Sequence, residues 1–334
     1  MFAYYLRTYV PIPNSGNREC GDQTLYDRRM LNVVVIGKQA SNWIERLRSA
    51  RPDDRFDIDG DWNDPSVVNA AVISVPNAKP LLRYPSLGFI QSLWMGVDAL
   101  LSDPELGPHT ALARMVDPGM PVSMAETVAA HVLWAHRHGD VYQRNQRNRV
   151  WEERHQPLAP QRTVTMLGLG ELGGRSAQTL IQLGFTVVGW SRSATPVDGV
   201  HVTANLEVAL SAGEIVVNLL PLTDATRGVL NVNAFRAMPV DGVLINVGRG
   251  AHVVEADLLD ALDASHIRHA ILDVFAEEPL PAEHRYWIHP HVTVTPHVAA
   301  DSMPATCIPV VAENLRRFAA GEPLNHLVDR TRGY

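Results

Sequence analysis

The chain has 334 residues, of which 46% are hydrophobic and 19% charged, and its formal net charge is −7. This length exceeds what one hydrophobic core normally serves and suits two domains. The composition is that of a folded protein and excludes a disordered one. The negative charge gives no field that attracts nucleic acid or an anionic membrane, and no apolar run reaches the roughly 18 residues of a membrane span.

The two cysteines, Cys20 and Cys307, are too few for a disulfide framework or for a metal site built on cysteine pairs. Low cysteine content suits a reducing compartment, so we predict a cytoplasmic protein without a metal site.

Residues 1–29 show no hydrophobic periodicity, whereas Met30 is followed at once by the apolar run LNVVVIG. We therefore expect the folded part to begin near Met30, with residues 1–29 as a poorly ordered extension or the product of a wrongly assigned start codon.

Apolar runs typical of buried strands recur through the first third of the chain. They lie at Leu31–Ile36, Ala71–Val75, Gly88–Leu93 and Met115–Val116. Helical patterns such as Ser41–Arg48 separate some of them, which predicts parallel strand–helix–strand units. A long helical pattern then begins at Met124, directly after Pro118, Gly119 and Pro121, and indicates a domain junction.

A second series of strands and helices follows this junction. Its strand-like runs are Thr163–Leu167, Thr186–Gly189, Ile215–Leu219, Val243–Val247, Ala270–Val274 and Thr293–Thr295. Six strands that alternate with helical or loop segments predict a doubly wound sheet. After Pro304, a last helical pattern at Ala305–Ala319 leads out of this domain.

A glycine-rich fingerprint follows the first strand of the second series. The residues Gly168-Leu169-Gly170-Glu171-Leu172-Gly173 have the GxGxxG spacing and open a helical segment, the context in which this motif binds dinucleotides. Gly168 permits a tight turn, Gly170 lets the backbone approach a pyrophosphate, and Gly173 lets the helix pack on the strand. The N–H groups of the first helical turn, at Glu171 and Leu172, can then bind phosphate.

The end of the next strand indicates which dinucleotide is bound. An NAD enzyme typically places a carboxylate there for the ribose hydroxyls, but the sequence reads Trp-Ser-Arg-Ser, and no carboxylate occurs before Asp198. The hydroxyl of Ser191 and the guanidinium of Arg192 suit the additional phosphate of NADP. We therefore predict a preference for NADP(H), with NAD(H) possible; the alternative is that Arg192 is a solvated loop arginine.

Three further motifs lie at the predicted carboxyl ends of strands, where ligands bind in open α/β sheets. They are Asn246–Gly250, Asp273–Leu280 and Thr295–Ala300. An arginine can hold a carboxylate and polarise the neighbouring carbonyl, and a histidine can deliver a proton near neutral pH. A glutamate beside the histidine favours the protonated imidazole. Together these residue types suit the reduction of a keto acid.

At these motifs the chain resembles the D-isomer-specific 2-hydroxyacid dehydrogenases, and within them a bacterial subgroup that reduces glyoxylate and hydroxypyruvate. The resemblance covers about Leu31 to Tyr334 and includes GLGELGG, the WSRS turn, NLLPLTDATRGVLN, INVGRGAHVVEADLLDAL, LDVFAEEPLP, HPHVTVTPHVAA and VDRTRGY. The family's catalytic arginine, glutamate and histidine fall on Arg249, Glu278 and His297. Glu278 is favoured over Glu277 because it directly precedes proline.

The resemblance also implies binding residues. Those for the cofactor are Leu220, Pro221 and, beside the nicotinamide carboxamide, Asp273. The substrate carboxylate is expected at Arg249 and at the backbone N–H groups of Met95 and Gly96, within the motif Met95-Gly96-Val97-Asp98. Trp43 and Arg114 are possible pocket residues, although a core tryptophan and a surface arginine remain equally open. Trp94 stands where a small residue is common, which leaves the pocket size open.

The architecture implied by the resemblance is two Rossmann-like or flavodoxin-like doubly wound α/β domains with an active-site cleft between them. Residues 30–123 and 304–334 would form a discontinuous substrate domain, residues 124–303 the NAD(P)-binding domain, and the latter would join a homodimer. The expected activity is reduction of small 2-keto acids, such as glyoxylate or hydroxypyruvate, to D-2-hydroxy acids with NADPH. A dehydrogenase for a larger or phosphorylated substrate, or a dinucleotide-sensing corepressor-like protein, remains an alternative.

Overall fold

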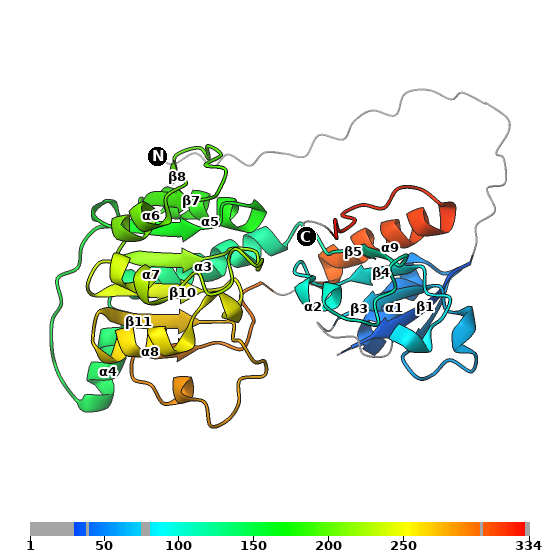
Figure 1. Cartoon of the computed structure of the whole chain (residues 1–334), viewed down its shortest axis with the longest axis horizontal. Helices are drawn as coiled ribbons and strands as arrows, with labels where there is room; N and C mark the ends of the chain where they lie inside the picture. The colour runs from blue at the N-terminus through cyan, green and yellow to red at the C-terminus, as the bar shows by residue number, and fades with distance from the viewer. Residues whose placement is uncertain (1–29, 38–39, 75–80, 301–302, 331–334) are drawn as a thin grey trace, which may run out of the picture.

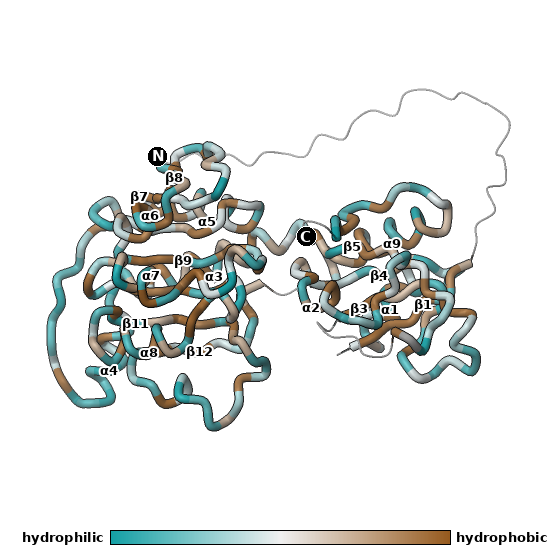
Figure 2. The backbone as a smooth tube through the Cα atoms, in the orientation of Figure 1, coloured by the Kyte–Doolittle hydropathy of each residue, from teal (hydrophilic) through white to brown (hydrophobic). Residues whose placement is uncertain are grey.

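The computed structural model describes residues 30–37, 40–74, 81–300 and 303–330, so the prediction for residues 1–29 lies outside the described part of the chain. The described residues form two parallel β-sheets, each covered by its own helices (Figure 1). Hydrophobic residues gather on the strands and on the inner faces of these helices (Figure 2). No helix among the described residues is long and apolar enough to cross a membrane.

The first domain is built on a five-stranded sheet. Its strands are β1 (Asn32–Ile36), β2 (Arg55–Ile58), β3 (Ala70–Ile73), β4 (Phe89–Ser92) and β5 (Ala111–Ala113). They are parallel and lie in the order β2-β1-β3-β4-β5, which is the flavodoxin-like doubly wound order. The sheet therefore confirms the expected α/β class for this part of the chain.

Helices cover both faces of the first sheet. They are α1 (Ala40–Ala50), α2 (Asp98–Leu101), the 3-10 turns η1 (Pro65–Val67) and η2 (Leu81–Arg83), and α9 (Pro304–Ala320). The long helix α9 packs beside α1, where Val311 and Leu315 join Val33, Val35 and Leu47 in one core. The last helix of the chain thus returns to the first sheet.

The second domain is built on a seven-stranded sheet. Its strands are β6 (Thr163–Leu167), β7 (Thr186–Trp190), β8 (His201–Thr203), β9 (Ile215–Asn218), β10 (Gly242–Asn246), β11 (Ile267–Leu272) and β12 (Val292–Val294). All are parallel and lie in the order β12-β11-β10-β9-β6-β7-β8. This is the order of the dinucleotide-binding fold, whose crevice forms where the winding reverses, between β6 and β9.

Alternate residues of the second sheet enter two different cores. The covering elements are α3 (Met120–His136), α4 (Gly139–Asn148), α5 (Glu171–Gln182), α6 (Leu206–Ala212), α7 (Val232–Ala237), α8 (Glu255–Asp263), η3 (Ala159–Gln161), η4 (Gly250–His252) and η5 (Arg285–Trp287). Val164 and Met166 pack with α3 and α5, whereas Leu167 packs with α6, α7 and α8. A parallel sheet buried on both faces explains the continuous apolar runs in the sequence.

The predicted helix start at Met124 and the predicted strand at Met115–Val116 were wrong. Helix α3 begins at Met120, because Pro121 in the first turn lacks an N–H group that would have no partner inside the helix anyway. Strand β5 ends at Ala113, because the N–H of Met115 turns away to the carbonyl of Trp94.

The long helical pattern after Met124 is divided into two helices. His138 adopts a left-handed conformation with φ of 58°, and α4 starts at Gly139. A side chain at Gly139 would lie 2.3 Å from Nε1 of Trp134, so the close turn requires glycine. Strands β2 and β8 were not predicted, because both are short and lie at sheet edges.

Candidate active site

Three loops of the second domain converge at the carboxyl edge of its sheet. Arg249 follows β10, Glu278 follows β11 and His297 follows β12. Because β10, β11 and β12 are adjacent parallel strands, residues that follow them lie at the same edge. Residues 94–97, the loop between β4 and α2 of the first domain, contact two of these side chains, Trp94 the imidazole of His297 and Gly96 the guanidinium of Arg249. The structure therefore brings together the predicted catalytic set.

His297 and Glu278 form a hydrogen-bonded pair, with 2.7 Å between Nδ1 of the imidazole and Oε2 of the carboxylate. The other carboxylate oxygen accepts the N–H of Phe275 at 2.9 Å. Burial alone raises the pKa of Glu278, but these hydrogen bonds and the charges of His297 and Arg249 outweigh it, so that its pKa lies below the usual value. The ionised carboxylate is thus ready to stabilise a protonated imidazole.

Asp273 fixes the loop that carries His297. Its carboxylate is 1% exposed and accepts the hydroxyl of Thr295 at 2.6 Å and the N–H groups of Val298 and Ala299 at 3.0 Å each. The N–H of His297 donates to the carbonyl of Asp273 at 2.8 Å, while His297 itself has a positive φ of 56°. These bonds hold His297 in a conformation that a non-glycine residue rarely adopts unaided.

Arg249 contacts the first domain directly. Its Nε lies 3.3 Å from a carboxylate oxygen of Asp98, and its Nη1 donates to the carbonyl of Gly248 at 2.9 Å. The guanidinium also lies against the backbone of Gly96, where an added Cβ would be 1.4 Å from Nη2. The predicted substrate loop and the predicted substrate arginine are therefore in contact.

The N–H groups of Met95 and Gly96 have no hydrogen-bond acceptor within the part of the chain that the structure describes. Two free backbone donors beside a guanidinium form a site suited to a carboxylate. Trp94, which precedes them, contacts the imidazole of His297 edge to face, with ring centroids 5.1 Å apart. A large aromatic side chain thus occupies the space beside the candidate proton donor.

The two possible pocket residues, Trp43 and Arg114, differ in position. Trp43 is 6% exposed and belongs to the core between α1 and the first sheet, which fits its interpretation as a core tryptophan. Arg114 is half-buried at the end of β5, where its N–H donates to the carbonyl of His326. Its positive charge contributes, after burial, to the lowered pKa of His326.

The glycine loop has the geometry that the fingerprint requires. Gly168 has φ of 96°, and a Cβ there would lie 2.8 Å from the carbonyl oxygen of Leu219. A Cβ at Gly173 would be 2.0 Å from the carbonyl oxygen of Gly168, so helix α5 packs against the turn only with glycine. At Gly170, by contrast, nothing lies within 4 Å of an added Cβ. This open space, beside the N-terminus of α5, fits a pyrophosphate.

The end of β7 fits the additional phosphate of NADP. The hydroxyl oxygen of Ser191 is buried and has no hydrogen-bond partner among the described residues. Arg192 is exposed, and its guanidinium makes no hydrogen bond or ion pair with any residue that the structure describes. A buried hydroxyl without a hydrogen-bond partner, next in sequence to a guanidinium that makes no ion pair among the described residues, suits the binding of a phosphate.

Some residues at this edge were not singled out by the sequence analysis. Asn218 and Asn246 end their buried strands, and His252 and Asp98 contact Arg249. A polar residue that ends an otherwise apolar strand was the available signal for the two asparagines. No group of three or more histidine, cysteine, aspartate or glutamate side chains within the described residues is placed to hold a metal ion.

The strand order and glycine loop define the second domain as a dinucleotide-binding domain, and the side chains at its edge suit a dehydrogenase. The sequence profile for the D-isomer specific 2-hydroxyacid dehydrogenase NAD binding domain matches residues 129–299. The chain is 37% identical over 310 residues to glyoxylate/hydroxypyruvate reductase A of Yersinia enterocolitica, covering 89% of this chain and 97% of that protein. The chain belongs to the D-isomer specific 2-hydroxyacid dehydrogenase family.

Solved structures agree with this assignment. A D-isomer specific 2-hydroxyacid dehydrogenase from Xanthobacter autotrophicus, in complex with NADPH and MES, is similar with a TM-score of 0.83 and 37% identity. That comparison covers 91% of this chain and 100% of the other. An NADPH-dependent glyoxylate/hydroxypyruvate reductase from Sinorhizobium meliloti, in complex with NADP and sulfate, gives a TM-score of 0.82 at 36% identity, with the same coverage.

Proposed function

We propose that the protein reduces small 2-keto acids, with glyoxylate and hydroxypyruvate as the expected substrates, and that it prefers NADPH. This proposal rests on one observation: a group of donors suited to a carboxylate lies beside a pair of side chains suited to acid–base chemistry. Arg249 and the Met95–Gly96 backbone form the first, and His297 with Glu278 forms the second. Relatives at 36–38% identity named glyoxylate/hydroxypyruvate reductase A support the substrate class.

The substrate's carboxylate is held by the N–H groups of Met95 and Gly96 and by the guanidinium of Arg249. The same guanidinium polarises the adjacent carbonyl, which makes its carbon more electrophilic. Asp98 stays paired with Nε of Arg249 and the carbonyl of Gly248 with Nη1, which leaves Nη2 as the main donor to the ligand. Arg249 therefore serves both recognition and catalysis.

His297 supplies the proton to the keto oxygen. Its Nδ1 is committed to Glu278, which leaves Nε2 as the donor toward the substrate. The carboxylate stabilises the imidazolium before transfer, and Asp273 holds the loop so that the ring stays in place. After transfer the neutral imidazole keeps its Nδ1–H bond to the carboxylate.

The cofactor is held by residues 168–173, by the loop at Leu220–Pro221, and by Ser191 and Arg192 at the additional phosphate. Bound NADPH supplies the hydride that the keto carbon accepts. The pyrophosphate meets the N-terminus of α5 at Glu171 and Leu172, where backbone N–H groups and the helix dipole favour an anion. The second domain, residues 124–303, then acts as the cofactor domain, and residues 30–123 with 304–334 act as the substrate domain.

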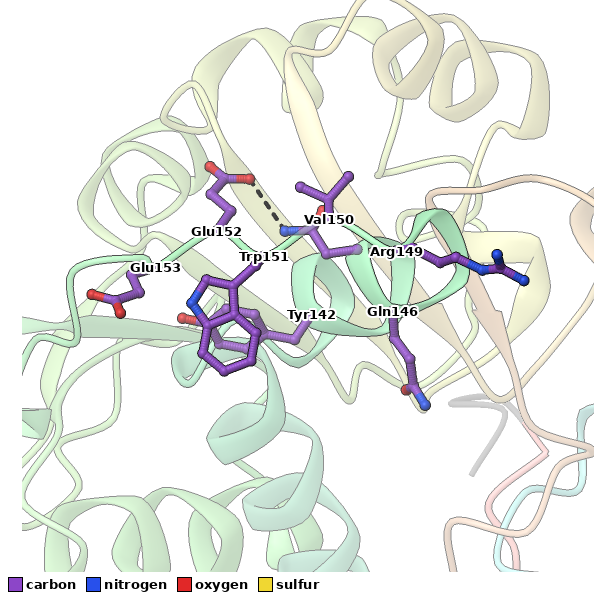
Figure 3. Close-up of a pocket in the computed structure, with 8 residues that line it drawn as sticks. Tyr142, Gln146, Arg149, Val150, Trp151, Glu152 and Glu153 are labelled. Carbon is purple, nitrogen blue, oxygen red and sulfur yellow. Dashed lines mark hydrogen bonds between the residues drawn. The ribbon is translucent and has the colours of Figure 1, made fainter.

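We further propose a homodimer joined through the second domain, in the cytoplasm. The connection from α4 to β6 runs along the outer edge of this domain (Figure 1). Tyr142 holds it by accepting the N–H of Arg154 and the amide of Gln156. Trp151 is nevertheless 94% exposed and, with Tyr142, lines a hollow on this surface (Figure 3). A fully exposed tryptophan on an ordered arm is best explained by a second copy that covers it.

Light scattering after size-exclusion chromatography tests the dimer. We expect the mass to be twice 36.8 kDa for the unmodified chain and a lower mass for Trp151→Glu. The matched control is Trp287→Glu, at a half-exposed tryptophan in η5 outside the arm. A monomeric unmodified protein, or an unchanged mass in Trp151→Glu, would contradict this part of the proposal.

The activity is tested by following NADPH and NADH absorbance with glyoxylate, hydroxypyruvate, pyruvate and phenylpyruvate. Fast turnover of the first two acids with NADPH supports the proposal. Turnover of bulky acids alone would instead indicate a dehydrogenase for a larger substrate. Tight NADPH binding without turnover of any acid would indicate a dinucleotide sensor.

A further inference from the structure

His252 is a buried histidine that the reaction outlined above does not use. Its side chain is 0% exposed and lies between two loops of the site, one after β9 and one after β10. Its Nδ1 lies 3.2 Å from the backbone nitrogen of Arg249 and 2.9 Å from Nδ2 of Asn218. Its Nε2 lies 3.3 Å from the carbonyl oxygen of Pro221. One imidazole thus bridges the substrate arginine and the expected cofactor loop.

The hydrogen bonds fix the protonation of this ring. The backbone N–H of Arg249 can only donate, so Nδ1 of His252 must be an unprotonated acceptor. A carbonyl oxygen can only accept, so Nε2 must carry the hydrogen that it shares with Pro221. His252 is therefore neutral, with its proton on Nε2.

The orientation of Asn218 agrees with this assignment. Its Nδ2 donates to Oδ1 of Asn246 at 2.8 Å as well as to His252, and its Oδ1 accepts the N–H of Leu220 at 3.3 Å. Asn246 in turn donates from Nδ2 to the carbonyl of Arg249 at 3.1 Å. The backbone of Arg249 is thus held at its N–H by His252 and at its carbonyl by Asn246.

We propose that neutral His252 is a positioning residue that sets the backbone of Arg249 for the keto acid and, through its other nitrogen, the loop at Pro221 for the dinucleotide. The inference rests on the proposed function, because it assigns Arg249 to the substrate and Pro221 to the cofactor. Burial lowers the pKa of His252 to about 4, so the ring keeps this form near neutral pH.

The ring is closely packed on the side of Gly248. An added Cβ at Gly248 would lie 3.3 Å from Nδ1 of His252 and 3.0 Å from Nδ2 of Asn218. A protonated Nδ1 would place its hydrogen against two donors, the N–H of Arg249 and Nδ2 of Asn218. The relative position of the loops at Arg249 and Pro221 therefore depends on the imidazole of His252.

Two conservative substitutions test separately the hydrogen bond to the N–H of Arg249 and the hydrogen bond to the carbonyl of Pro221. The side-chain oxygen of asparagine reaches about as far as Nδ1 of histidine, and the side-chain nitrogen of glutamine about as far as Nε2. In His252→Asn, which keeps the acceptor for Arg249, we expect KM for glyoxylate within threefold of the unmodified protein and NADPH affinity at least tenfold weaker. In His252→Gln, which keeps the donor for Pro221, we expect the reverse pattern. In His252→Leu, which removes both hydrogen bonds, we expect a higher KM for glyoxylate and weaker NADPH binding.

The measurements are NADPH affinity by isothermal titration calorimetry, steady-state KM and kcat for glyoxylate, and Tm for each variant. The control is His266→Gln, since the ring of His266 bonds, among the described residues, only the backbone carbonyl of Phe235, elsewhere in the same domain. The inference would be overturned if the asparagine and glutamine variants showed the same changes in glyoxylate KM and NADPH affinity. It would also be overturned if these changes merely tracked the fall in Tm, or if His252→Leu kept full activity. If the unmodified protein turned over no keto acid, the proposed function would be overturned instead. Calorimetry with NADPH would then still test the hydrogen bond from His252 to Pro221.

Discussion

The indole of Trp94 and the imidazole of His297 meet edge to face, with ring centroids 5.1 Å apart and planes at 82°. The tryptophan comes from the first domain and the histidine from the second, so the contact joins the two sides of the site. Because the indole fills the space beside His297, the proposed proton donor, we expect it to restrict the substituent that a keto acid can carry. The same packing holds the imidazole ring from one side.

We predict that Trp94→Ala raises the ratio of kcat/KM for phenylpyruvate over glyoxylate by about tenfold or more, since a change of pocket size is typically worth about 1–3 kcal/mol. Steady-state kinetics with both acids measures the ratio. Trp287→Ala, at a half-exposed tryptophan in η5, is the control for loss of an indole. An unchanged ratio in Trp94→Ala would show that the substituent points elsewhere.

Gly96 leaves room for the guanidinium of Arg249, because a Cβ at this position would be 1.4 Å from Nη2 and 2.6 Å from Cζ. Gly96→Ala therefore displaces the arginine from the free N–H groups of the substrate loop. We expect kcat/KM for glyoxylate to fall by roughly a hundredfold, the scale of a lost charge-assisted contact to the reacting group. NADPH affinity, measured by calorimetry, should stay within a few-fold.

The control for Gly96→Ala is Gly107→Ala in the same domain, where the nearest atom to an added Cβ is a side-chain hydroxyl of Thr110. That hydroxyl, which donates to the carbonyl of Leu87, needs to move by only a few tenths of an ångström, so activity should be retained. Full glyoxylate activity of Gly96→Ala would mean that Arg249 leaves Gly96 when substrate binds.

Arg192 and Ser191 offer a buried orphan hydroxyl and an uncommitted guanidinium at the end of β7. Arg192→Ala should raise KM for NADPH by at least tenfold and leave KM for NADH within twofold, because only NADPH carries the additional phosphate. Arg175→Ala, at an exposed arginine on α5, is the matched control. Equal increases for the two cofactors would identify Arg192 as a solvated arginine.

The sequence predicted the strands of both sheets best where apolar residues form continuous runs, as at Thr163–Leu167, which β6 matches residue for residue. It failed where short edge strands carry few apolar residues, as at His201–Thr203. It also failed where a proline sits inside a first helical turn, as at Pro121. Tertiary contacts decide the edge strand, whereas the early helix start is possible because a first-turn N–H has no partner inside the helix and proline can therefore stand there.

For the site, fixed spacing around glycine and proline located the loops that carry Arg249, Glu278 and His297. The residues that hold them were not predictable in this way. His252 folds back on Arg249 within the loop after β10, and Asp98 reaches Arg249 from the other domain. Such contacts depend on how loops fold back and how domains meet, which sequence periodicity does not encode.

Buried neutral histidines should make the protein sensitive to acid. Burial lowers the pKa of His252 to about 4 and that of His269 to about 3, from the ordinary histidine value of 6.5. The unfolded chain therefore binds more protons than the folded one below pH 6.5. The free energy of unfolding is largest above pH 6.5 and falls as the pH drops toward the folded-state values, by about 2 kcal/mol per histidine at pH 5.

His269 allows this prediction to be tested outside the site. It is 3% exposed, its Nε2 meets the hydroxyl of Thr293, and its Nδ1 has no partner among the described residues. His269→Phe removes one neutral buried imidazole, so the fall in Tm between pH 7 and pH 5 should be smaller by roughly 4 °C. Differential scanning fluorimetry at both pH values measures it, with His109→Phe at an exposed histidine as the control. If both variants lose as much Tm as the unmodified protein, the acid sensitivity arises from groups other than His269.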